Sequence, residues 1–143
     1  MFVHPQCPCT RASIEELNRL LARSREKVKA HVFFPTTTAH DWTTSSLRRN
    51  ATAIPGVTVS DDPEGEQARL FGAETSGSVL LFDRAGKMIF HGGITSSRGH
   101  AGDNVGESAV LSLVVGEKTV VTQTPVFGCA LLNAARDSSS ETP

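Results

Sequence analysis

Apolar positions follow two different spacings at the start of the chain. Five of them recur every three or four residues, which predicts a helix with one buried face; they are Ile14, Leu17, Leu20, Leu21 and Val28. Residues 2–4 before them are aromatic and β-branched, and residues 28–35 after them form an apolar run that ends at a proline. Short runs of this composition are typical of buried strands. The opening pattern is therefore strand, helix, strand.

The start of this first helix has two interpretations. Ser13 and Glu16 have the spacing of a capping box, which places the start of the helix at Ser13. Cys7 as N-cap with Pro8 at the first helical position gives an earlier start. The early start puts the thiols on the helix terminus, and the late start leaves them in the preceding loop. The pattern of residues leaves both starts open.

The middle of the chain predicts shorter elements. A short helix is expected at residues 42–49 within a polar stretch, and a brief strand at residues 57–60 follows a Pro-Gly turn. The next helix is expected to have Asp61 or Asp62 as its cap, Pro63 at its start and Gly72 as its stop.

Two apolar runs at residues 79–82 and 88–91 flank a turn that contains Gly86, and this pattern predicts a β-hairpin. A last helix is expected after Asn104 or Asp103 and before Gly116. Its inner face is expected to consist of Val105, Ala109, Val110, Leu113 and Val114.

This alternation of strands and helices, closed by a hairpin and a helix, favours an α/β class with a mixed sheet. A chain of 143 residues is long enough for one domain with its own core. We expect that domain to span residues 1–132, with its first strand shortened if residues precede Met1. The Ser-rich residues 133–143 are expected to form a disordered tail.

The charge is balanced, with 14 basic and 15 acidic side chains and a net charge of −1. Nucleic acids and anionic membrane surfaces require a basic excess, so neither is expected as the main partner. No apolar run approaches the roughly 18 residues of a membrane span. Because the chain opens in a strand-like run instead of a basic region, we expect no secretory signal in these residues. We expect a periplasmic or membrane-anchored protein if residues precede Met1, and a cytoplasmic one otherwise. The oligomeric state is left open.

Three cysteines are too few for a disulfide scaffold, so their chemistry is the more informative property. Cys7 and Cys9 flank Pro8 at the junction between the first strand and the first helix. With this Cys-Pro-Cys, and with the stretch LFGAETSGSVLLFDRAGKMIFHGG, the chain resembles the thioredoxin superfamily over residues 2–116. It resembles most the bacterial thioredoxin-like proteins of the RedB type.

This resemblance implies a three-layer α/β/α fold and thiol–disulfide exchange with cysteine-containing proteins, without a cofactor. Two features depart from the family. Its Cys-x-x-Cys has lost one residue here, and Gly77 or Ser78 stands where its cis-proline faces the active-site cysteines. If the Pro-Cys pairs are aligned, Gln6 takes the position of the nucleophile. If the first cysteines are aligned, Cys7 takes it.

Chemistry at a helix terminus favours Cys7 as the attacking thiol and Cys9 as the resolving one. Unpaired backbone N–H groups and the helix dipole stabilise a thiolate there, and Pro8 removes only a donor that would go unpaired. Thr10 and Arg11 follow directly and are expected to support the site, Arg11 by its positive charge. A disulfide between positions i and i+2 closes a small, strained ring, which favours an oxidant or isomerase.

The third cysteine and the histidines leave two questions open. Cys129 lies in an apolar segment, so it is either a buried core residue or a third thiol that folds back to the site. Copper or zinc delivery or sensing is the alternative function, with Cys7 and Cys9 as ligands together with His4 or His100. The glycine-rich loop that carries Arg98 and His100 is interpreted as the rim of the site, where both would contact a partner.

Overall fold

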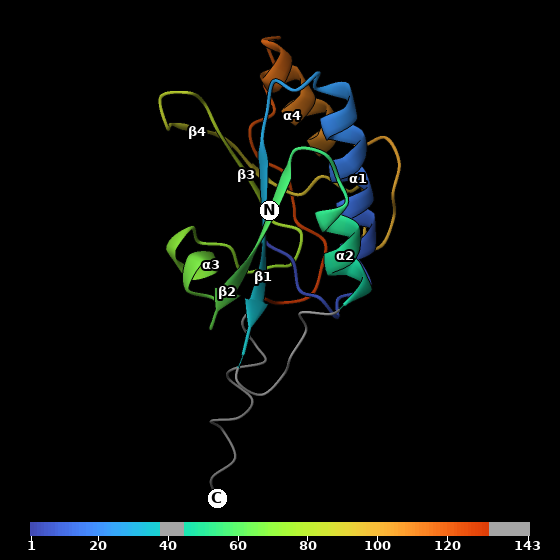
Figure 1. Ribbon diagram of the computed structural model, residues 1–143. Helices are drawn as coiled ribbons and strands as arrows, with labels where there is room; N and C mark the ends of the chain where they lie inside the picture. The colour runs from blue at the N-terminus through green and yellow to red at the C-terminus, as the bar shows by residue number, and fades with distance from the viewer. Residues whose placement is uncertain (38–44, 132–143) are drawn as a thin grey trace, which may run out of the picture.

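The computed structural model describes residues 1–37 and 45–131 of the chain (Figure 1). Helices and strands alternate over most of that length. In chain order they are α1 (Thr10–Arg23), β1 (Ala30–Thr36), α2 (Ser46–Thr52), β2 (Val57–Pro63), α3 (Glu66–Leu70), β3 (Val79–Phe82), β4 (Met88–Gly92) and α4 (Val105–Val115). The protein is a small mixed α/β protein with a short parallel and a short antiparallel sheet. The mixed α/β class expected from the sequence is thereby confirmed.

The two sheets meet at the N-terminal residues. β1 pairs with β2 in parallel and β3 pairs with β4 in antiparallel. Phe2 forms a parallel bridge with Phe33 of β1 and an antiparallel bridge with Ser78 beside β3. Its amide donates to the Ser78 carbonyl at 2.9 Å, and the Phe33 amide donates to the Met1 carbonyl at 2.9 Å. The strand expected at residues 2–4 is thus reduced to the bridges of Phe2, but it lies between the two strand pairs.

Helices cover this arrangement on different sides. Figure 1 shows α1 and α2 on one side of β1 and β2, and the short α3 on the other. The main core is built from side chains of the strands, α1 and α4; its buried members include Val3, Ile14, Leu17, Leu20, Val32, Phe34, Leu81, Phe90, Ile94 and Val110. Each such side chain contributes roughly 1.5–3 kcal/mol by leaving water. Of the apolar face predicted for the first helix, Ile14, Leu17 and Leu20 are buried and Leu21 is partly buried.

The boundaries of α1 differ from both predictions. The helix begins at Thr10 with Cys9 as its N-cap, between the two expected starts. Ser13 lies inside the helix, so the capping box with Glu16 is wrong. The helix ends at Arg23 with Ser24 as its C-cap, and the chain then leaves the right-handed helical region, with φ of 52° at Arg25 and 62° at Glu26. Val28, expected as its last apolar position, packs on the core from the following loop.

The region around α3 also differs. β2 extends to Pro63, three residues beyond the expected strand, so Pro63 does not start the helix. Gly65, with φ of 66°, is the N-cap of α3. Asp62 nevertheless satisfies the first turn from the end of the strand, because its buried carboxylate accepts from the amides of Gln67 at 2.8 Å and Ala68 at 3.0 Å.

The hairpin and the last helix agree with the sequence. Asn104 caps α4 by accepting the Glu107 amide at 2.9 Å, and Gly116 ends the helix with φ of 82°. Val105, expected on the inner face, is instead 63% exposed because it lies at the first turn of the helix.

Two predictions meet the limits of the described residues. α2 begins at Ser46 and ends at Thr52, later than the expected helix, and residues 42–44 of that prediction lie outside the described residues. The tail predicted at residues 133–143 lies outside them as well. Within residues 1–37 and 45–131, no helix has the length and apolar character to cross a membrane.

Candidate functional site

The loop before α1 places both cysteines of the Cys-Pro-Cys motif at the start of the helix. The Cys7 amide donates to the His4 carbonyl at 3.2 Å, and the Thr10 amide donates to the Cys7 carbonyl at 3.0 Å. Cys9 is the N-cap residue but makes no side-chain cap bond, so its thiol is not used to satisfy the helix. Both cysteines are nearly inaccessible, with 1% exposure for Cys7 and 6% for Cys9.

A buried network of hydroxyl groups holds the first turn of α1 in place. The Thr10 hydroxyl donates to the His4 carbonyl at 2.8 Å, and the His4 amide donates to the Ser76 hydroxyl at 2.8 Å. The Thr10 and Ser76 oxygens are 2.9 Å apart. Since the single proton of Thr10 goes to His4, Ser76 is the donor between the two. Thr10, expected to support the site, therefore does so by fixing the loop that carries Cys7.

Ser76 is a site residue that the sequence analysis missed. It stands next to Gly77 and Ser78, the pair expected where the family has its cis-proline. No cis peptide bond occurs in the described part of the chain. The Gly77 amide donates to the Phe2 carbonyl at 2.8 Å and the Ser78 carbonyl accepts from Phe2, so both residues hold the N-terminal strand. Ser76 is the residue of this loop whose side chain reaches the site. Nothing in the sequence distinguishes it from Ser78.

The C-terminal segment folds back onto the cysteines. The Cys129 amide donates to Cys7 Sγ at 3.2 Å across 122 residues of sequence. The Ser76 amide donates to the Cys129 carbonyl at 2.7 Å, which ties the same segment to the loop behind the site. Cys129 is partly exposed. Of the two interpretations left open for Cys129, the structure shows the third thiol beside the pair.

Gly128 allows this close approach. A Cβ on Gly128 would collide with the Ser76 carbonyl oxygen, so any other residue would push the segment away from the site. The requirement comes from space, since Gly128 is not among the glycines with positive φ. The position of Cys129 next to Cys7 therefore depends on a glycine immediately before it.

The surroundings of Cys7 favour its thiolate. Burial raises the pKa of the Cys7 thiol, but hydrogen bonds from the Cys129 thiol and from the amides of Cys129 and Cys9 outweigh it and lower the pKa to about 7. Thr10 faces Cys7 as well, although its hydroxyl proton is donated to the His4 carbonyl. A substantial fraction of Cys7 is therefore ionised near neutral pH.

Cys129 has the opposite character. The pKa of its thiol is raised, first because its proton is engaged in the hydrogen bond to Cys7 and then because of burial. When Cys7 is ionised, the pair therefore consists of a Cys7 thiolate and a protonated Cys129. These are the two partners that a thiol–disulfide reaction needs, one as nucleophile or leaving group and one as a proton carrier.

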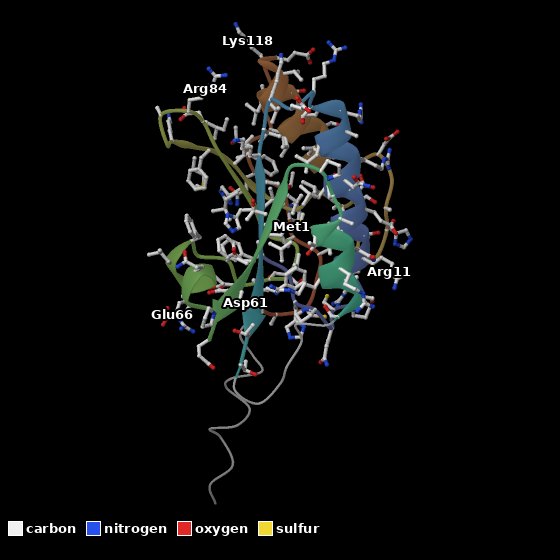
Figure 2. The ribbon with its side chains drawn as sticks, in the orientation of Figure 1. Met1, Arg11, Asp61, Glu66, Arg84 and Lys118 are labelled. Atoms are coloured by element: carbon white, nitrogen blue, oxygen red, sulfur yellow. The ribbon has the colours of Figure 1, made fainter. Side chains whose placement is uncertain are left out.

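The positive charge of the site comes from Arg98 in the glycine-rich loop. Its Nη2 lies 3.8 Å from Cys129 Sγ. The pKa of Arg98 is raised, first by a hydrogen bond to Cys9 and by the negative charge that Cys9 would carry, so the guanidinium also lies beside Cys9. Arg11, expected to supply this charge, is exposed, and Figure 2 shows it on the outer side of α1. Arg98 thus confirms the expected place of its loop at the rim of the site.

The histidines occupy different places. His4 Nδ1 accepts the Gln6 amide at 3.1 Å, and burial lowers its pKa. His100 is exposed, and its Nδ1 lies 3.0 Å from the Arg98 carbonyl within their own loop. Across residues 1–37 and 45–131, no three side chains of the His, Cys, Asp or Glu types are gathered as a metal site would require.

A second buried titratable cluster joins α1 to α4. Glu16 and Glu107 are 0% and 1% exposed. Glu16 Oε1 accepts the Gly102 amide at 2.7 Å and Arg19 Nη1 at 3.1 Å, and Arg23 Nη1 lies 3.5 Å from Glu107 Oε1. Burial, followed by the hydrogen bond and the charge of Glu16, raises the pKa of Glu107 to about 7. Glu16 Oε2 is buried and has no other protein group as a hydrogen-bond partner in the described part of the chain. The hydrogen bond between Glu16 and Glu107 requires a proton on one of the two carboxyl groups.

Comparisons with known proteins identify the fold only. No family model and no curated protein matches the chain. The chain is similar to the crystal structure of an uncharacterized conserved protein from Geobacillus kaustophilus, with 22% identity and a TM-score of 0.72 over 92% of this chain and 74% of that one. It is also similar to a hypothetical protein from Sinorhizobium meliloti 1021, with 22% identity and a TM-score of 0.67 over 92% of this chain and 76% of that one.

Proposed function

We propose that this protein carries out thiol–disulfide exchange on cysteine-containing proteins through Cys7 and Cys9. The observation that carries the proposal is the hydrogen bonding of Cys7 Sγ, which accepts the Cys129 amide at 3.2 Å while its thiol pKa is lowered to about 7. A thiol with a pKa near ambient pH combines a substantial thiolate fraction with good nucleophilicity.

The reaction begins with the Cys7 thiolate. It attacks one sulfur of a partner disulfide, and the other partner sulfur leaves as a thiolate and takes up a proton. Cys9 then loses its proton, attacks Cys7 Sγ in the mixed disulfide and releases the second partner thiol. Two electrons pass from the protein to the partner, and a Cys7–Cys9 disulfide remains. The reverse sequence oxidises a partner dithiol, and the small ring of an i,i+2 disulfide favours that direction.

We further propose that the domain is a thioredoxin-like three-layer α/β/α domain, similar to proteins of the RedB type. Its support is the order of elements: a strand residue, Phe2, leads into the cysteine loop and α1, and the chain closes with the β3–β4 hairpin and α4. The missing residue in the Cys-Pro-Cys motif and the trans peptides at Gly77 and Ser78 are the departures from that family.

The experiment is a redox titration in glutathione buffers with a chelator present, read by thiol alkylation and intact mass. One two-thiol step with a midpoint between roughly −270 and −120 mV is expected. Cys7→Ser is expected to abolish the step. In a Cys129→Ser background the step belongs to Cys7 and Cys9 alone, so adding Cys9→Ser should abolish it as well. If Cys7 stays reduced at every potential, the proposal is wrong.

A further inference from the structure

The three sulfur atoms differ in accessibility, and this limits how a partner can react. Cys7 is 1% exposed and Cys9 is 6% exposed, whereas Cys129 is partly exposed. A sulfur in a folded partner is attached to a bulky chain and must reach its target sulfur directly. Neither thiol of the Cys-Pro-Cys pair offers that access. Of the three cysteines, Cys129 is the one that is partly accessible to solvent.

Cys129 contacts Cys7 directly and is connected to Cys9 through Arg98. Its amide donates to Cys7 Sγ at 3.2 Å, and its thiol donates a further hydrogen bond to the same sulfur. Arg98 Nη2 lies 3.8 Å from Cys129 Sγ and hydrogen-bonds to Cys9. The guanidinium of Arg98 therefore stabilises negative charge on the sulfur of Cys9 or of Cys129.

We propose that Cys129 is the partner-facing thiol, which exchanges with protein substrates and passes the disulfide to and from the buried Cys7. This inference rests on the proposed function and, for a protein-sized substrate, replaces the direct reaction of Cys7 with the partner by a route through Cys129. The substrate class is a protein dithiol or disulfide on a flexible or unfolded segment.

The steps balance without any further reagent. In the oxidised protein the Cys7–Cys9 disulfide rearranges first: Cys129 loses its proton and attacks Cys7 Sγ, and Cys9 leaves with the electron pair beside Arg98 and takes up a proton. A partner thiolate then attacks Cys129 Sγ, and Cys7 leaves as a thiolate. A second partner thiolate attacks the partner's own sulfur, Cys129 leaves and is protonated, and the partner gains a disulfide. Two electrons have moved from the partner to the protein.

The charges at the site suit these roles. A leaving group of low pKa leaves faster, and Cys7 is the thiol held as an anion by amide donors. The attacked sulfur is best placed at the surface, where Cys129 lies. The rearrangement also relieves the small Cys-Pro-Cys ring, because Cys7 and Cys129 come from segments that are far apart in sequence.

The test compares a protein substrate with a small one. Oxidised wild-type protein and the variants are mixed with reduced, unfolded ribonuclease, or with dithiothreitol, and loss of the substrate thiols is followed. Cys129→Ser is expected to slow the oxidation of ribonuclease by about tenfold or more and that of dithiothreitol by less than about threefold. Ala130→Ser, the neighbouring exposed position, is the matched control and should react like the wild type.

Peptide mapping without reduction gives the second readout. Wild-type protein and Cys9→Ser, oxidised with glutathione disulfide, are both expected to contain a Cys7–Cys129 disulfide. If no such disulfide forms, or if Cys129→Ser oxidises ribonuclease at the wild-type rate, the relay is wrong while the proposed function stands. If Cys7→Ser still oxidises both substrates, the proposed function itself is wrong. Circular dichroism of the reduced variants checks that each one is folded.

Discussion

The pKa values of two buried acids in this protein are shifted in opposite directions. The pKa of Cys7 is lowered to about 7, and that of Glu107 is raised to about 7. Both groups are about 1% exposed, and burial alone raises the pKa of each, because a low dielectric disfavours the anion. The sign of the net shift is therefore decided by the neighbours.

The neighbours of the two groups differ in what they can donate. Cys7 faces two backbone amides and a protonated thiol, all of which donate hydrogen bonds to an anion. Glu107 faces the carboxyl group of Glu16. A proton on Glu107 removes the repulsion between two carboxylates and forms a hydrogen bond to Glu16. Arg19 and Arg23 lower the pKa of Glu107, but they do not cancel that pairing. The fold thus stabilises the anion of Cys7 before the start of α1 and the protonated form of Glu107 between α1 and α4.

The largest expected effect tests the buried Glu16–Glu107 pair between α1 and α4. Glu107 holds a proton in the folded state up to about pH 7 that the unfolded chain releases near 4.5. Its contribution to stability is therefore complete below about pH 4.5 and is lost as the pH rises to about 7 and above. Glu107→Gln imitates the protonated form, so at pH 8 it is expected to raise the free energy of unfolding by about 1–3 kcal/mol.

Urea unfolding at pH 5 and pH 8 measures this difference. The gain from Glu107→Gln should shrink toward pH 5, where Glu107 is mostly protonated. Glu15→Gln, which removes an exposed carboxyl beside Glu16, is the control and should show no comparable gain. An equal gain at both pH values would contradict the shared proton.

The next effect tests the hydrogen bonds that Ser76 makes at the start of α1. Ser76→Ala removes the acceptor of the His4 amide and the partner of the Thr10 hydroxyl, all in buried surroundings. An unsatisfied buried polar group costs about 1–3 kcal/mol, so a loss of that size is expected in thermal or urea unfolding. Ser108→Ala, on the exposed side of α4, should change the stability by less than about 0.5 kcal/mol.

The third effect tests why Cys7 is an anion. Removal of the Cys129 thiol by Cys129→Ala takes away one hydrogen bond but leaves the backbone amides in place. The pKa of Cys7 is expected to rise by about one unit, measured by the pH dependence of iodoacetamide alkylation followed by peptide mapping. An unchanged pKa would mean that the amides alone lower it.

The smallest effect concerns the exposed cation. Arg98→Met removes the guanidinium beside Cys9 and Cys129. Because Arg98 is solvated, we expect the pKa of Cys7 to rise by only a few tenths of a unit, and less at high salt. A rise as large as that of Cys129→Ala would assign the thiolate to long-range charge instead of local hydrogen bonds. Arg11→Met on the outer side of α1 is the matched control.

Local sequence signals predicted helices and turns correctly where the residues of the signal contact only their near neighbours in the chain. The cap of α4 at Asn104 and its stop at Gly116 are interactions within a few residues, and both are observed. The β3–β4 hairpin was predicted from two short apolar runs around a turn, and it is observed too. The capping box of Ser13 and Glu16 failed for the opposite reason. Glu16 is used in a tertiary contact with Gly102 and α4, so its side chain is not available to cap α1.

The sequence by itself determined the mixed α/β class, the place of Cys7 and Cys9 beside the first helix, and the position of Arg98 in a loop. Only the tertiary structure decided that Cys129 meets Cys7, that Ser76 holds the cysteine loop, and that Arg98 instead of Arg11 supplies the charge. The physical reason is one of range. Periodicity and capping act over a few neighbouring residues, whereas the pKa of a buried thiol depends on donors that the fold brings from distant segments.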